Sequence, residues 1–278
     1  MNTEKLQEAQ QALQNGLANL VSTEGWKDYL RAQARFHNYS FQNVIWLTCQ
    51  AMARGVHATR FAGYQTWRGL GRNVRKGETS FKVLAPCGYK GVDKATGEEV
   101  YRVRGFRVAS TFELSQTDGE PLPEPVKKLE GSSEELRAAF AKVEKYNTSR
   151  GLTVVRETLN GPNGLYNRLN REIKLDSSLS DLQAFKTLCH ETAHSLLHNS
   201  DEGDSRATKE VEAESVAFVV CHALGIDSAE YSLGYVAHWA NGDMKLVQDV
   251  AVRVQKTAKI IVALFEVKSE ENAEEVAA

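Results

Sequence analysis

Residues 180–198 read SDLQAFKTLCHETAHSLLH, and this stretch decides how the second half of the chain folds. It contains the pattern H-E-x-x-H, with His190 and His194 four residues apart and Glu191 between them. On an α-helix, residues at this spacing lie about 40° apart on one face, one turn from each other. Both imidazoles can then bind one metal ion, with the carboxylate close to a water molecule. The stretch therefore predicts a helix that carries a zinc-dependent hydrolase site.

A catalytic zinc ion needs a third protein ligand and one open position. We expect this ligand in the helix predicted over residues 209–224, where Glu210 and Glu214 share a face that continues into apolar side chains. Burying an unpaired carboxylate is costly, so this face favours a metal or a metal-bound histidine as its partner. We predict Glu210 as the third ligand and Glu214 as a second-shell acceptor for the N–H of a ligand histidine. A solvated acidic helix is the competing interpretation.

Two nearby residues are predicted to lie outside this site. His198 is four residues beyond His194, but it rises a further turn and drifts away from an ion that the first two histidines hold. We interpret it as a histidine at a helix end. Glu212 points roughly away from the face that carries the predicted ligand.

The predicted chemistry is peptide hydrolysis, with Glu191 as the base that takes a proton from water and passes it to the leaving amine. An oxyanion donor is also needed, and Tyr235 is the leading candidate, ahead of Tyr231 and His238. A packing role is at least as good an interpretation of each tyrosine. A hairpin predicted over residues 164–176 offers a strand edge to an extended peptide.

The bulk composition is typical of a globular protein with room for two domains. Of the 278 residues, 42% are hydrophobic and 25% are charged. We find no apolar run of membrane-spanning length and no secretory signal. The four cysteines form no C-x-x-C pair, so reduced thiols and a cytoplasmic location are expected.

The net charge of −2 hides an asymmetry between the two halves of the chain. Residues 26–110 hold 15 basic and 5 acidic residues, whereas the remainder is acidic overall. This distribution indicates a module that binds a polyanion. In residues 36–43 and 61–82, aromatic, amide and cationic side chains alternate, as in proteins that bind single-stranded nucleic acid. Several of these aromatics must also build a core, and a solvated basic face is the alternative for the arginines.

Periodicity and turn residues predict an α+β protein of two domains. Helices are expected over residues 4–21, 26–50, 133–146, 180–198, 209–224 and 244–265, and strands over 80–86, 100–112 and 152–157. The predicted organisation is an N-terminal α+β domain over 1–118, a proline-rich linker over 119–132, a second domain over 133–267 and a disordered tail over 268–278.

Three motifs of the first half resemble the N-terminal domain of the ArdC antirestriction family. They are Asn38-Tyr39-Ser40-x-x-Asn43, the run from Phe61 to Glu78, and Phe112-x-Leu114-Ser115-Gln116-Thr117. The second half resembles the zincin metallopeptidase domain of that family and of ImmA/IrrE proteases. The resemblance implies a domain that binds single-stranded DNA, fused to a gluzincin-type domain and carried by mobile elements.

Carried over residue by residue, the resemblance implies zinc ligation by His190, His194 and Glu210, with Glu191 as the catalytic base. It also implies a DNA-binding surface made of Tyr39, Ser40, Asn43, Tyr64, Trp67, Arg68, Arg72, Arg75 and Lys76. The expected partners are single-stranded DNA and a protein or peptide substrate, with no membrane. Two alternatives stay open: a non-catalytic DNA-binding antirestriction protein with a structural zinc, and a repressor-cleaving protease similar to ImmA.

Overall fold

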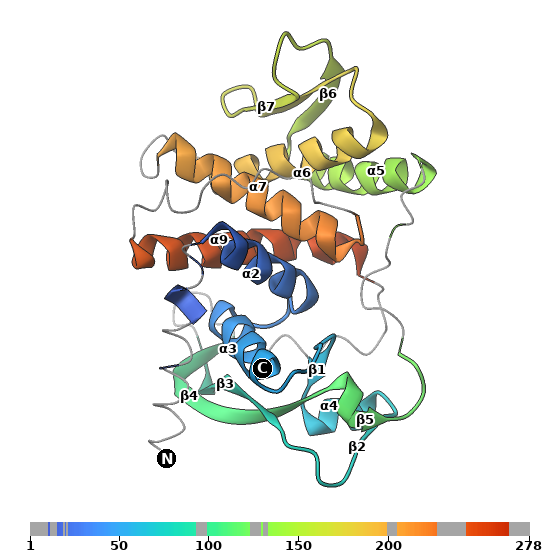
Figure 1. The fold of residues 1–278 in the computed structure, drawn as a ribbon. Coiled ribbons are helices and arrows are strands. Elements are labelled where there is room, and N and C mark those ends of the chain that lie inside the picture. The colour runs from blue at the N-terminus through green and yellow to red at the C-terminus, as the bar shows by residue number, and fades with distance from the viewer. Residues whose placement is uncertain are drawn as a thin grey trace. The chain divides into compact units, whose positions relative to one another are not determined.

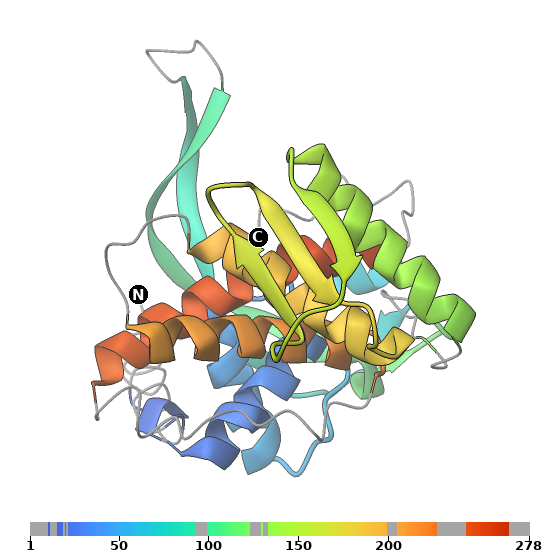
Figure 2. The same ribbon diagram turned by 90° about the horizontal axis from the view of Figure 1, so that it is seen from above.

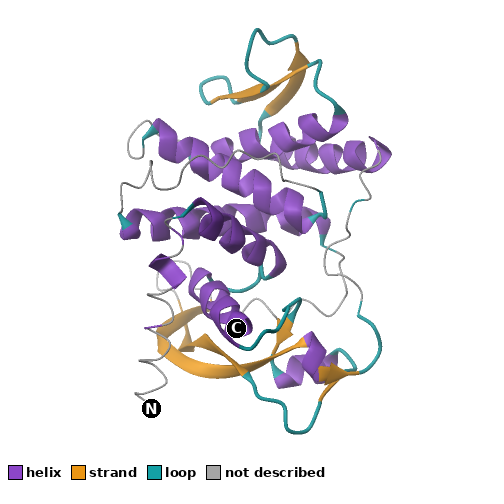
Figure 3. Ribbon diagram, viewed as in Figure 1, coloured by secondary structure: helices purple, strands orange, loops and turns teal. Residues whose placement is uncertain are grey.

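The computed structural model describes residue 11, residues 16–18, residue 20, and residues 22–92, 99–122, 129, 133–198, 205–226 and 243–266. Helices and three small sheets alternate along these residues, which gives the α+β class that the sequence predicts (Figures 1 and 3). Within the described ranges, every helix is too short or too polar to cross a lipid bilayer.

The chain divides into two compact units whose boundary differs from the predicted one. One unit contains residues 42–123, and the other contains residues 17–41 together with 124–267. Residues 17–41, which the predicted domain over 1–118 includes, belong to the second unit. The predicted tail over 268–278 and most of the predicted linker and of the helix over 4–21 lie outside the described residues.

The first unit, which we call the N-terminal unit, is built on a three-stranded antiparallel sheet with the order β1-β4-β3. Phe61 and Phe81 pack edge to face in its core, with ring centroids 4.9 Å apart. Its elements are α3 (Phe41–Ala53), β1 (Phe61–Ala62), α4 (Tyr64–Gly69), β2 (Asn73–Val74), β3 (Phe81–Val92), β4 (Glu99–Glu113), η1 (Leu114–Gln116) and β5 (Thr117–Asp118).

Two amide side chains of α3 cover the free edge of β3. The amide of Asn43 donates to the carbonyl of Leu84 at 2.9 Å and accepts from its N–H at 2.7 Å. Gln50 does the same at Lys82, at 2.8 Å in each direction. The outward backbone groups of Lys82 and Leu84, which an edge strand would otherwise offer to another chain, are thus satisfied within the protein.

Strands β3 and β4 continue as a long two-stranded ribbon (Figure 2). Their register shifts between Cys87 and Gly88, because Cys87 lies opposite Gly105 whereas Gly88 lies opposite Val103. Arg104 is therefore an extra residue, a β-bulge, in β4. A bulge changes which side chains of its strand share a face.

The second unit, which we call the C-terminal unit, combines a helical bundle with a three-stranded mixed sheet of order β6-β8-β7. Strand β8 pairs parallel with β6 and antiparallel with β7, so the predicted hairpin over 164–176 is confirmed. Its elements are α2 (Thr23–Arg35), α5 (Ser133–Ser149), β6 (Thr153–Glu157), β7 (Gly164–Asn167), β8 (Glu172–Asp176), α6 (Asp181–Leu197), α7 (Arg206–Ala223), α9 (Met244–Val262) and η2 (Ala263–Phe265).

Helix α2 belongs to this unit because its apolar face packs on α7. Trp26 and Leu30 are fully buried, and the indole N–H of Trp26 donates to Ser215 at 3.0 Å. Truncation of a buried tryptophan costs about 3–5 kcal/mol, which is enough to fix this helix in place. The single helix predicted over 26–50 is instead two helices, α2 and α3, which end and begin on either side of residues 36–40.

Local signals in the sequence set the ends of the two helices that carry the predicted ligands. At the start of α6, Ser180 and Gln183 form a reciprocal capping box. Ser205 caps α7 by accepting from the N–H of Thr208 at 3.2 Å. Gly225 follows α7 with a φ of 76°, which is the left-handed conformation predicted for a glycine at this position.

Candidate metal centre

The two histidines of the H-E-x-x-H pattern lie together on one face of α6. Their Nε2 atoms are 3.0 Å apart, and their rings meet edge to face with centroids 4.7 Å apart. The opposite face of the helix carries Leu188, Cys189 and Ala193, which are fully buried. Burial of that apolar face directs both imidazoles away from the core.

Glu210 of α7 completes a three-residue cluster with these histidines. Its Oε2 atom lies 3.5 Å from Nε2 of His190 and 3.8 Å from Nε2 of His194. A triangle with these sides has a centre about 2 Å from each corner, which is the length of a bond from zinc to nitrogen or to a carboxylate oxygen. Among the described residues, the ligand atoms of these three side chains lie close enough together to hold one metal ion. Two imidazoles and a carboxylate are donors that suit zinc and other divalent transition metals.

The electrostatics of the cluster agree with its geometry. The imidazoles of His190 and His194 hold the pKa of Glu210 far below its usual range. Burial lowers the pKa of His190, but the carboxylates of Glu210 and Glu214 outweigh this effect and raise it. Glu214 lies 3.8 Å from Nδ1 of His190, which is an ion-pair distance rather than a hydrogen bond. Glu214 is therefore next to a ligand histidine, as predicted, but at a distance longer than a hydrogen bond.

Glu191 is 6% exposed and lies against strand β7. A Cβ atom added to Gly164 would meet Thr187 at 2.6 Å and the Cγ atom of Glu191 at 3.1 Å, so only glycine lets the strand approach this closely. Burial raises the pKa of Glu191, while the neighbouring histidines and the backbone N–H of Tyr166 act in the opposite direction. Burial thus disfavours the charged form of this carboxylate.

A comparison with known protein families identifies the first half of the chain. The family model of the N-terminal domain of the anti-restriction factor ArdC matches residues 3–143, more than half of the chain. The chain belongs to the ArdC antirestriction family.

A curated protein is similar in sequence to this ArdC family member. An uncharacterized protein of Bacillus anthracis is 26% identical over 293 aligned positions, which cover 90% of the chain and 49% of that protein. The chain thus spans about half the length of this curated relative.

Two crystal structures of the antirestriction ArdC protein from the R388 plasmid also match. The metal-free structure is 25% identical with a TM-score of 0.51, and the match covers 82% of the chain and 87% of that protein. The Mn(II)-bound structure is 21% identical with a TM-score of 0.53, and the match covers 94% and 99%.

A chain of hydrogen bonds behind the metal cluster was missed by the sequence analysis of this ArdC family member. Nδ1 of His194 lies 2.8 Å from Nδ1 of His198, whose Nε2 lies 2.8 Å from Oε2 of Glu212. The other oxygen of Glu212 accepts from Nε of Arg253 at 2.5 Å. Glu212 is fully buried, and its partners are His198 and Arg253 rather than the three predicted ligands. The four-residue spacing of His194 and His198 was a sequence signal that could have indicated their hydrogen bond.

The predicted DNA-binding residues of this family member fall into two groups. Trp67, Asn43 and Arg72 are at most 9% exposed and have structural partners. The indole of Trp67 donates to the carbonyl of Phe112 at 3.0 Å, and Asn43 covers the edge of β3. These three are part of the core of the N-terminal unit rather than surface groups, because each satisfies backbone groups that would otherwise be unpaired.

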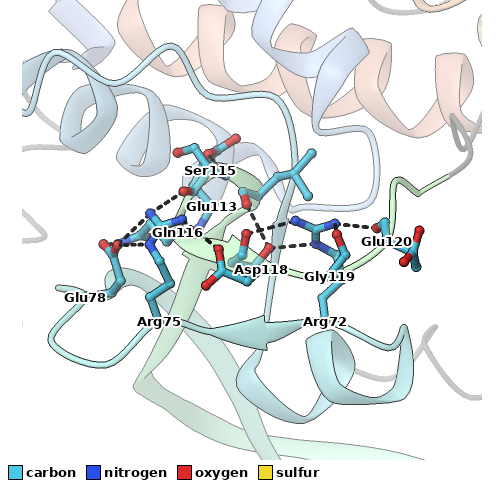
Figure 4. A network of polar contacts seen from close by, with 11 residues as sticks. Arg72, Arg75, Glu78, Glu113, Ser115, Gln116, Asp118, Gly119 and Glu120 are labelled. Atoms are coloured by element: carbon cyan, nitrogen blue, oxygen red, sulfur yellow. Dashed lines mark hydrogen bonds and ion pairs between the residues drawn. The ribbon is translucent and has the colours of Figure 1, made fainter.

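Figure 4 shows the polar contacts of Arg72 and Arg75, two arginines of the predicted DNA-binding set. Arg72 donates to Thr117 and to the carbonyls of Gly119 and Glu120. Arg75 is exposed, but its guanidinium is paired with Glu78 at 2.7 Å and also contacts Asp118. Both guanidiniums therefore already have oxygen partners within the protein.

The remaining members of the predicted set are divided between the two units. Tyr64, Arg68 and Lys76 are exposed on the N-terminal unit, whereas Tyr39 and Ser40 belong to the C-terminal unit. The carbonyl of Tyr39 accepts from Gln255 of α9. The predicted oxyanion donor Tyr235, with Tyr231 and His238, lies outside the described residues.

Proposed function

We propose that this ArdC family member is an antirestriction protein whose C-terminal unit is a zinc-dependent metallopeptidase. The observation that carries the proposal is the convergence of His190, His194 and Glu210 beside the buried carboxylate of Glu191. A metal that served structure alone would favour four protein ligands. Three protein ligands leave a position for water and substrate, as in catalytic sites. The Mn(II)-bound crystal structure of the plasmid R388 protein supports a divalent ion in this family.

The proposed chemistry assigns one task to the ion and the others to the chain. A zinc ion held by the three ligands would polarise a peptide carbonyl and make water more acidic. Glu191 takes the proton of the attacking water and delivers it to the leaving amine. Gly164 allows β7 to lie against this carboxylate and to shield it from bulk solvent. Tyr235 stays the proposed oxyanion donor.

The substrate that this geometry favours is an extended peptide. Within the described part of the chain, β7 has β8 as its one strand partner, and its Tyr166 N–H reaches the carboxylate of Glu191. A peptide that added to the free edge of β7 would place its backbone close to Glu191 by the strand addition that many peptide-binding proteins use. This strand edge suits an extended peptide better than a small ester.

The decisive test compares wild type with Glu191→Gln, which keeps the shape of the side chain and removes the base. Metal analysis is expected to find one zinc per chain in both proteins, whereas only wild type cleaves a library of unstructured peptides. Glu157→Gln, on an exposed part of β6, is the control for a lost surface charge. Equal cleavage by wild type and Glu191→Gln would refute the catalytic proposal.

We further propose that the chain binds single-stranded DNA, which the basic excess of residues 26–110 favours. Binding is expected to weaken steeply with salt and to prefer single strands over duplex. If Glu191→Gln keeps full protection against restriction in cells, the chain acts as a non-catalytic DNA-binding protein with a structural metal. If protection is lost with the catalytic base, proteolysis is part of the function.

A further inference from the structure

The β3–β4 ribbon carries three arginines whose common face the sequence does not reveal. Arg102 lies directly opposite Tyr89, and Arg107 lies directly opposite Ala85. Residues that are directly opposite in an antiparallel pair share a face, and so do residues four apart on an unbroken strand. Arg102, Arg107 and Tyr89 therefore lie on one face of the ribbon.

The β-bulge is the reason for this shared face. Arg102 and Arg107 are five residues apart, which in a regular strand would place them on opposite faces. The extra residue, Arg104, restores the alternation between them. Arg104 itself turns to the same face, because its guanidinium carbon lies 4.4 Å from the centre of the Tyr89 ring. We call Tyr89, Arg102, Arg104 and Arg107 the arginine face.

The side chains of the arginine face are exposed to solvent, and two of them lie close to the backbone of the ribbon. All three arginines are exposed, and Tyr89 is 43% exposed. A Cβ atom at Gly91 would lie 3.5 Å from Nε of Arg102 and 3.6 Å from the Tyr89 ring, so both side chains rest against this glycine. The guanidinium of Arg104 lies over one face of the Tyr89 ring, and the tyrosine keeps 43% of its surface exposed.

Charge separates the two faces of the ribbon. Glu99 is the acidic residue of the described outer ribbon (residues 85–92 and 99–107), and it pairs with Lys90 at 3.5 Å. Both alternate away from Tyr89 and lie on the opposite face, where Val103 and Phe106 are exposed. Among the described residues, no carboxylate forms an ion pair with the arginine face. That face therefore has a net positive charge and is suited to bind an anionic partner.

We propose that the arginine face binds single-stranded nucleic acid, with guanidiniums on phosphates and the Tyr89 ring stacked on a base. Guanidinium forks match phosphate oxygens, and an exposed ring between cations is how single strands are held without sequence preference. Stacking requires an unpaired base, which duplex does not offer. The assignment rests on the single-strand binding proposed above and gives it a surface other than the one that the sequence predicted.

The test uses the full chain and a fluorescently labelled oligothymidylate, with binding measured by anisotropy over a range of salt. Each lost phosphate contact reduces the slope of log K against log salt by about 0.7, so R102Q/R104Q is expected to reduce it by about 1.4. At 0.1 M salt this corresponds to roughly 25-fold weaker binding. The matched control R137Q/K145Q removes the same charge from exposed positions of α5 and is expected to bind like wild type. R68Q/K76Q removes it from exposed positions of the surface that the sequence predicted and tests that surface in parallel.

A second pair of variants tests the ring without changing charge. Y89L is expected to weaken binding by about five-fold or more, whereas Y89F, which keeps the stacking surface, binds like wild type. Circular dichroism melting curves of all variants check that the fold is kept. Should R102Q/R104Q melt early, the Y89L and Y89F pair decides, because it leaves every charge in place.

The outcomes distinguish a failure of single-strand binding itself from a failure of its assignment to the arginine face. If wild type fails to bind the oligonucleotide at low salt, single-strand binding itself is refuted, and the arginine face with it. If wild type binds but R102Q/R104Q and Y89L bind equally well, or if R68Q/K76Q carries the loss, only the assignment to this face is overturned. Equal affinity for duplex, with no effect of Y89L, would contradict base stacking.

Discussion

Glu212→Gln is expected to weaken metal binding although Glu212 contacts no metal. When Nε2 of His194 binds an ion, its ring proton is on Nδ1 and donates to His198, whose own Nε2–H donates to Glu212. The buried carboxylate thus holds both rings in one tautomer and orientation. Loss of such an outer partner typically lowers metal affinity by about 10–100-fold.

The stability cost is expected to be smaller than for a fully buried ion pair. Breaking such a pair costs about 3–5 kcal/mol when the remaining charge stays buried. Here the side chain of Arg253 is 36% exposed, so its guanidinium can regain water, and glutamine keeps one oxygen acceptor. We expect about 1–3 kcal/mol of lost unfolding free energy in the metal-free protein.

The assay is competition for zinc against a fluorescent chelator, together with urea unfolding of the metal-free protein. Glu214→Gln is the control, since Glu214 is on the same helix but 3.8 Å from its histidine. We expect a smaller loss of affinity for this control than for Glu212→Gln. A folded Glu212→Gln protein with the zinc affinity of wild type would show that the hydrogen-bond chain does not position His194.

Three further predictions concern packing, the arginine network and pH. Gly164→Ala is expected to lower the unfolding free energy by about 1–3 kcal/mol, because its Cβ would lie 2.6 Å from Thr187, whereas Gly69→Ala, with no atom within 4 Å, is neutral in the same urea titration. Arg72→Met is expected to cost about 2–4 kcal/mol through its lost hydrogen bonds, yet to leave the salt dependence of DNA binding unchanged; a reduced slope would place Arg72 back on the DNA surface. Burial alone would raise the pKa of Glu113, but hydrogen bonds from its neighbours outweigh burial and hold the pKa below 4.5. Stability from this carboxylate is therefore present above pH 4.5 and is lost as the pH falls through the lower folded-state pKa. Melting curves in acid should show a smaller pH dependence for Glu113→Gln, and identical curves would exclude the residue.

The parts of the site that one helix determines were predictable from the sequence. The four-residue spacing of His190 and His194 is a local property of α6, and the structure places their Nε2 atoms 3.0 Å apart. Glu210 was predicted from the apolar face of the next helix, which needs only helical periodicity. The short distances to both histidines agree with that reasoning.

The residues that sequence reasoning missed depend on partners far along the chain. Glu212 is compensated by His198 and by Arg253, which is 41 residues away, and no local pattern links the three. Trp67 and Arg72 were expected to contact DNA because composition cannot separate a buried aromatic or a structural guanidinium from an exposed one. The positions at which backbone carbonyls need donors are known only once the fold is known.

The place of α2 has a consequence for how this protein can be divided and inherited. Residues 17–41 belong to the compact unit of the metal site, and residues 42–123 form the other unit. Residues 42–123 are therefore inserted between two segments of the C-terminal unit, residues 17–41 and 124–267. Recombination or truncation near residue 120 would deprive α7 of Trp26, so the C-terminal unit cannot be exchanged as one contiguous segment.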